Sequence, residues 1–156
     1  MALHPNGRVF YSSLERESAV GVFELELSAG EVRELQSISS LPAGVSAEKN
    51  TASGIVVHPS GEYVYSSNRG HDSISLFTTD DHGLLELETT VPVQGNFPIQ
   101  LALTPDARML YAACVRSSSV SAFAVEDGGA RLAPLQVTSV PTVMSTVFWD
   151  DSDADA

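Results

Sequence analysis

Apolar and polar residues alternate along most of the chain in short runs, which turns rich in Pro, Gly, Asn and Asp separate. The segments AVGVFEL (19–25), SISLFTT (73–79) and SVSAFAV (119–125) alternate apolar residues with small or polar ones. This period of two is typical of a half-buried β-strand. Shorter β-rich runs precede each of them, and Gly-containing turns lead into further strands. The pattern predicts an all-β protein.

Three of these units align without a gap: HPNGRVFYSSLERESAVGVF (4–23), HPSGEYVYSSNRGHDSISLF (58–77) and TPDARMLYAACVRSSSVSAF (104–123). Each has Pro at its second position, Tyr at its eighth and Phe at its last. Four strands per unit, at a period of roughly 45–55 residues, are typical of a β-propeller blade. We therefore expect a partial propeller over 1–149, with three four-stranded antiparallel blades at about 1–40, 53–95 and 99–140, an unpaired inner strand at 142–149, and a disordered acidic tail at 150–156.

Composition excludes several classes of function. The net charge of −12 argues against a nucleic-acid binder, because such proteins need clustered Lys and Arg. No apolar run approaches the ~18 residues of a membrane span, and the N-terminus lacks a signal pattern, which favours a cytoplasmic location. Cys114 is the single cysteine and lies in an apolar run, so we expect it to be buried and inert. No histidine spacing indicates a metal site, and no motif indicates a cofactor.

The loop after the shared Tyr carries the candidate chemistry. Glu15 of the first copy is aligned with Arg69 of the second and Val115 of the third. Equivalent positions in neighbouring blades lie close together at one end of a propeller, so a carboxylate and a guanidinium are expected to meet there. Arg can hold a carboxylate or a phosphate, and Glu can act as a base. The alternative is an ordinary surface ion pair that contributes little.

Asn68 and His71 flank Arg69 and are predicted to contact a substrate at the same loop. His71 could carry a proton. The alternatives are that Asn68 shapes the turn and that His71 is simply an exposed loop residue. Asp72 is aligned with Ser18 and Ser118 and is expected to cap the turn.

The stretch TASGIVVHPSGEYVYSSNRGHDSISLF (51–77) resembles the lactonase family of seven-bladed β-propellers, the 6-phosphogluconolactonase-like proteins. NFPIQLALTPDARMLYAACVRSSSVSAF (96–123) resembles the next blade of that family, and VPTVMSTVF (140–148) its closing strand. The resemblance implies a metal-free hydrolase of a sugar lactone. In it, Glu15 and Arg69 match positions at the mouth of the propeller, where a general base activates water and Arg groups hold a phosphate or the developing oxyanion.

The resemblance covers only the three C-terminal blades of the family, so the chain is expected to be a partial homologue. A Pro-Arg step of the family falls at Pro98-Ile99, where Ile cannot hold an anion. Two alternatives to a lactonase stay open. One is a non-catalytic propeller fragment that assembles with itself or with a separate chain supplying further blades. The other is a different reaction on the same fold, such as cycloisomerisation of a muconate-type acid.

Overall fold

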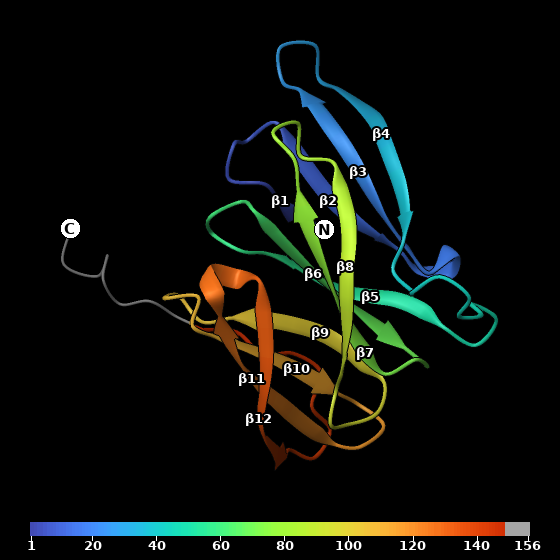
Figure 1. Cartoon of the computed structure of the whole chain (residues 1–156), viewed down its shortest axis with the longest axis vertical. Helices are drawn as coiled ribbons and strands as arrows, with labels where there is room; N and C mark the ends of the chain where they lie inside the picture. Colours follow the sequence, from blue (N-terminus) through green and yellow to red (C-terminus); the bar gives the residue numbers. More distant parts are fainter. Residues whose placement is uncertain (149–156) are drawn as a thin grey trace.

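The computed structural model describes residues 1–148, and its regular structure is almost entirely β (Figure 1). Three four-stranded sheets follow one another along the chain, and consecutive strands of each sheet pair antiparallel. Their strands are β1 (Ala2–Leu3), β2 (Val9–Leu14), β3 (Ala19–Glu26) and β4 (Glu31–Ser39); β5 (Thr51–Val57), β6 (Tyr63–Arg69), β7 (Ser73–Thr79) and β8 (Leu85–Pro92); β9 (Pro98–Leu103), β10 (Met109–Cys114), β11 (Ser119–Glu126) and β12 (Arg131–Ser139). Each sheet is one blade, as the repeat predicted.

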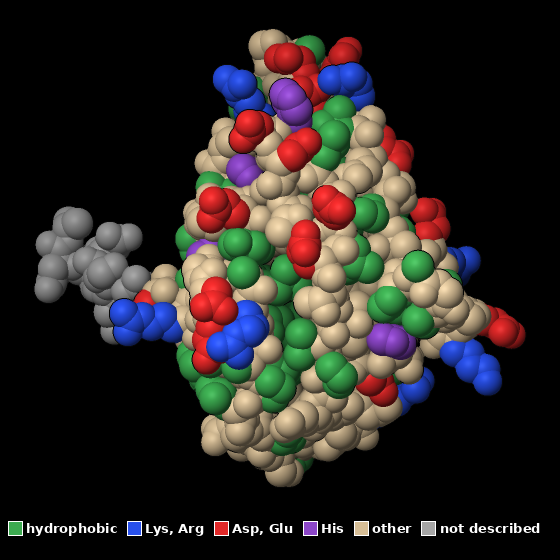
Figure 2. Space-filling model, viewed as in Figure 1, with side chains coloured by type: hydrophobic (Ala, Val, Ile, Leu, Met, Phe, Trp, Pro, Cys, Tyr) green, Lys and Arg blue, Asp and Glu red, His purple; other side chains and the backbone are tan. Residues whose placement is uncertain are grey.

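Two 3₁₀ turns, η1 (Glu15–Glu17) and η2 (Asp127–Gly129), are the other regular elements of residues 1–148. No helix among these residues has the length and apolar character needed to cross a membrane. Acidic side chains are spread over the visible face of the molecule rather than gathered in one place (Figure 2).

The predicted closing strand at 142–149 does not form in its described part, residues 142–148. A strand needs a partner with which to form a ladder, and no strand of residues 1–148 pairs with this segment. Side chains hold it instead: Gln100 Nε2 donates to the carbonyl of Thr146 over 2.8 Å, and the ring of Phe148 lies 5.1 Å from that of Tyr111. Residue 149 and the predicted acidic tail at 150–156 lie outside the described residues.

The apolar core lies between the blades. Because successive residues of a strand point to opposite faces of its sheet, each blade offers one apolar face to each neighbour. One cluster joins the first and second blades, and another joins the second and third. The fully buried members of the first cluster are Tyr11, Val20, Val22, Val64 and Phe77, and those of the second include Tyr65, Ile74, Leu110 and Phe123.

The shared Tyr of the repeat links each blade to the next. The hydroxyl of Tyr11 donates to the carbonyl of Gly83 over 3.0 Å, and that of Tyr65 donates to the carbonyl of Gly129 over 2.7 Å. Both acceptors lie in the turn before the outermost strand of the following blade. Burial raises the pKa of Tyr11 and of Tyr65, because a phenolate there would lose its hydration. The interblade hydrogen bond explains why Tyr occupies this position in the first two copies.

Replacing Tyr65 with Phe is expected to lower the free energy of unfolding by about 1 kcal/mol, since the carbonyl of Gly129 loses its buried donor. Tyr111→Phe is the matched control, because this Tyr lies at the same repeat position but on the last blade of residues 1–148. Urea unfolding followed by circular dichroism measures both. Equal losses in the two variants would contradict a specific contribution from the interblade bond.

Candidate functional site

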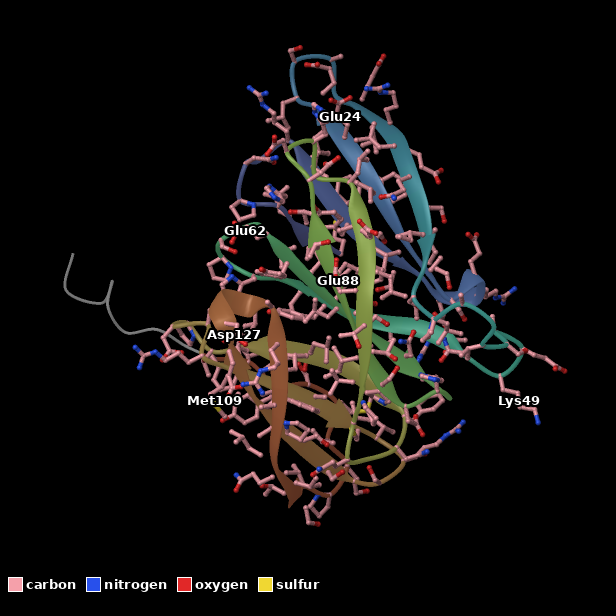
Figure 3. The ribbon with its side chains drawn as sticks, in the orientation of Figure 1. Glu24, Lys49, Glu62, Glu88, Met109 and Asp127 are labelled. Atoms are coloured by element: carbon pink, nitrogen blue, oxygen red, sulfur yellow. The ribbon has the colours of Figure 1, made fainter. Side chains whose placement is uncertain are left out.

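One end of the blades is formed by the loops that connect β2 to β3, β6 to β7 and β10 to β11, together with the segments that lead into β5 and β9. We call this end the mouth. Lys49, in the segment before β5, marks it on the right of Figure 3, whereas Glu24, near the end of β3, Glu62, just before β6, and Asp127, in η2, mark the other end of the blades. The mouth loops of the three blades have positive φ at the same repeat position, at Ser18 (52°), Asp72 (53°) and Ser118 (48°).

Glu15 and Arg69 meet at the mouth, as their repeat position predicted. Glu15 opens η1 in the first blade, and Arg69 ends β6 in the second. Arg69 Nη2 lies 2.7 Å from Glu15 Oε1, and the exposed fractions of the two side chains are 16% and 64%. The pair therefore joins two blades and leaves its carboxylate open to solvent. Catalytic roles for the two residues stay predictions.

Two residues that the repeat did not indicate complete the cluster. Phe97, in the segment before β9, places its ring centroid 5.3 Å from the guanidinium carbon of Arg69 and 3.8 Å from that of Arg116. Arg116 comes from the loop between β10 and β11. Two cations thus lie against one aromatic ring, each within the distance at which the ring attracts a cation.

Asp72 fixes the position of Phe97. Its Oδ1 accepts the backbone N–H of Phe97 over 2.8 Å and that of Gly70 over 3.3 Å, while its Oδ2 accepts the amide of Asn96. Phe97 has φ +63°, a conformation that bulky residues rarely adopt and that surrounding contacts must impose. Asp72 is therefore more than the expected cap of its own turn, because it holds the loop of the next blade as well.

Asn68 does not reach the mouth surface. Its side chain is fully buried, and its amide nitrogen donates to the carbonyl of Ser40 over 3.2 Å, to Ser73 Oγ over 3.1 Å and to Ser75 Oγ over 2.7 Å. Its Oδ1 accepts the hydroxyl of Ser40 over 2.6 Å. Every polar atom of the amide is thus occupied inside the protein. The burial corrects the predicted substrate contact and supports the alternative, a structural role.

His71 is exposed in the loop between β6 and β7. Its Nδ1 lies 2.8 Å from Ser73 Oγ, and its backbone N–H donates to Asn50 Oδ1 over 3.1 Å. No hydrogen bond or ion pair within residues 1–148 joins its ring to Glu15 or Arg69. Its proposed contact with a substrate stays a prediction.

Cys114 is buried and free, as its apolar surroundings indicated. Burial raises the pKa of its thiol, so the reactive thiolate is disfavoured. In the described part of the chain, no group of three or more His, Cys, Asp or Glu side chains could hold a metal ion.

Four-stranded antiparallel sheets that follow one another along the chain and pack face to face are the blades of a β-propeller. The chain belongs to the lactonase family of seven-bladed β-propellers, whose family model, "Lactonase, 7-bladed beta-propeller", matches residues 1–148.

Known proteins of this family cover nearly all of the chain. A 6-phosphogluconolactonase of Bacillus subtilis (strain 168) is 32% identical over 150 residues, which are 95% of this chain and 43% of the relative. A 6-phosphogluconolactonase of Pectobacterium atrosepticum is 27% identical over 140 residues, 86% of this chain and 40% of the relative. This chain therefore spans about two fifths of the length of these relatives.

Solved structures agree with the fold. The periplasmic gluconolactonase PpgL of Pseudomonas aeruginosa superposes with a TM-score of 0.82 at 28% identity, over 90% of this chain and 39% of that structure. A protein from Lactobacillus plantarum superposes with a TM-score of 0.85 at 23% identity, over 90% of this chain and 41% of its own, and supports the fold alone.

Proposed function

We propose that the chain carries part of a lactonase active site, with Glu15 as general base and Arg69 as the cation that stabilises the developing oxyanion of a sugar lactone. The observation that carries this proposal is the 2.7 Å contact between the two side chains across adjacent blades, with the carboxylate left exposed. Membership in the lactonase family and the names of its relatives support the same reaction class.

The residues suit hydrolysis without a metal. The carboxylate of Glu15 takes a proton from water while the water oxygen forms a bond to the lactone carbonyl carbon. The guanidinium of Arg69 donates to the carbonyl oxygen as it gains negative charge. When the tetrahedral intermediate collapses, the ring C–O bond breaks, and the protonated Glu15 returns its proton to the departing ring oxygen. The product is the open hydroxy acid.

Turnover of 6-phosphoglucono-δ-lactone and glucono-δ-lactone tests this proposal. Glu15→Gln and Arg69→Ala are each expected to lower kcat/KM at least tenfold, because removing a general base or an oxyanion donor costs about 100-fold or more in well-formed sites. Glu17→Gln is the matched control, since Glu17 lies in the same turn and is also exposed. Unchanged hydrolysis in both site variants would contradict the assignment, and turnover of a muconate instead would indicate the cycloisomerase alternative.

A second candidate function is assembly through the open face of the first blade. Met1, Leu3, Phe10, Leu25 and Val32 line one apolar hollow there. Phe10 occupies the repeat position of Val64 and Leu110, which pack into the cores that join each blade to the preceding one. The face thus fits a further blade, which we propose a second copy of the chain supplies. Light scattering on the purified protein tests this, and a mass of one chain would contradict it.

A further inference from the structure

Two positively charged side chains converge on one aromatic ring at the mouth. The guanidinium carbons of Arg116 and Arg69 lie 3.8 Å and 5.3 Å from the centroid of Phe97. Like charges repel. Because the net charge of the chain is −12, an overall excess of Lys and Arg does not explain why two Arg side chains lie together. Such convergence is typical of a site that receives an anion.

Both guanidinium groups have N–H donors that bind no acceptor within residues 1–148. Arg116 is exposed and forms no ion pair with any carboxylate of residues 1–148. Arg69 is mostly buried, and its Nε has no hydrogen-bond partner among the same residues, although its Nη2 contacts Glu15. Buried donors are nearly always paired in folded proteins, so this N–H is available to an acceptor from outside residues 1–148. The planar fork of Arg matches the oxygens of a phosphate or a carboxylate.

The site is held in place before any ligand arrives. The backbone N–H of Val115 donates to the carbonyl of Phe97 over 3.1 Å, and that of Arg116 donates to the carbonyl of Asn96 over 3.2 Å. Asp72 holds the same segment from the other side, through the backbone N–H of Phe97. Loops of the second and third blades are thereby joined around the ring. A preorganised site loses less conformational freedom on binding.

We propose that Arg116, held against Phe97 beside Arg69, forms a binding site for the phosphate or carboxylate group of a small polar ligand. Within the proposed function, on which this assignment rests for its biological meaning, Arg116 binds the acidic substituent of the lactone substrate, while Arg69 faces the reacting carbonyl. Arg116 is then a residue that selects charged over neutral lactones, and Phe97 aligns its guanidinium.

Calorimetric binding of compounds that the protein cannot hydrolyse tests the site apart from catalysis. The probes are 6-phosphogluconate, which carries both groups, glucose 6-phosphate, gluconate and neutral glucose. We expect at least one acidic probe to bind and glucose not to bind. Arg116→Gln is expected to weaken binding of that acid at least tenfold, and Arg116→Lys, which keeps the charge but not the planar group, by less.

Arg108→Gln is the matched control, because it removes one exposed positive charge just before the other end of β10, and it is expected to change affinity less than twofold. Equal weakening by Arg108→Gln and Arg116→Gln would overturn the proposal, as would failure of every acid to bind at millimolar concentration. Specific binding of an acid by a protein that hydrolyses no lactone would support the anion site while contradicting the proposed function.

Discussion

Replacing Gly54 with alanine is expected to lower the free energy of unfolding by about 3 kcal/mol, because the new methyl group would meet backbone rather than a movable side chain. Gly54 lies in β5, and a Cβ there would stand 2.7 Å from the backbone nitrogen of Leu101 and 2.8 Å from the Cα of Gln100. Both belong to β9, the inner strand of the next blade. The inner strands of the second and third blades approach each other too closely for a side chain at this point.

Gly30→Ala is the matched control for this prediction. Gly30 has φ +69°, and no other atom lies within 4 Å of the point where a methyl group would stand, so it carries a conformational cost without a clash. That cost is about 1 kcal/mol. Urea unfolding of the two variants separates crowding from backbone strain. A smaller loss for Gly54→Ala than for Gly30→Ala would show that the blades can move apart to accept the methyl group.

The sequence predicted the blades because each one is built from local patterns. Alternating strands, Pro-containing turns and the Tyr that recurs at positions 11, 65 and 111 all repeat with the blade, so aligning the copies located the sheets. The aligned copies did not identify Gly54 as a contact between blades, since a glycine in a strand indicates a close approach but not its partner. The predicted closing strand at 142–149 does not form in its described part for a related reason. Its residues have the right pattern, but a strand also needs a partner with which to form a ladder.

The site was predicted only where it follows the repeat. Glu15 and Arg69 occupy one repeat position, so their meeting could be expected before the structure was known. Arg116 is aligned with Gly70, one position beyond Val115, and Phe97 lies in a connection between blades that the aligned copies do not include. Their contact depends on how two loops are joined across a blade boundary. The spacing of residues within one copy therefore cannot predict the contact between Arg116 and Phe97.

Replacing Asn68 with leucine is expected to lower the free energy of unfolding by about 3 kcal/mol, a cost typical of a buried polar network that loses its central member. The two other copies have the apolar residues Leu14 and Cys114 at this position, so the repeat itself accepts an apolar side chain such as leucine here. In the second blade, however, the amide bonds to the carbonyl and hydroxyl of Ser40, where the chain leaves the first blade. The leucine would leave these groups without their buried partner.

A double-mutant cycle with Ser75→Ala distinguishes a connected network from a set of independent bonds. Ser75 Oγ accepts from the Asn68 amide over 2.7 Å and itself donates to the carbonyl of Ser40. If Asn68, Ser75 and Ser40 act together, Ser75→Ala lowers the free energy of unfolding less in the Asn68→Leu protein than in the unaltered one. The expected coupling free energy is about 1 kcal/mol or more. Purely additive losses would contradict the network. Because Asn68 directly precedes Arg69, Asn68→Leu is also expected to loosen the contact between Arg69 and Glu15. A fall in lactone turnover that parallels the coupling free energy would connect this buried network to the mouth.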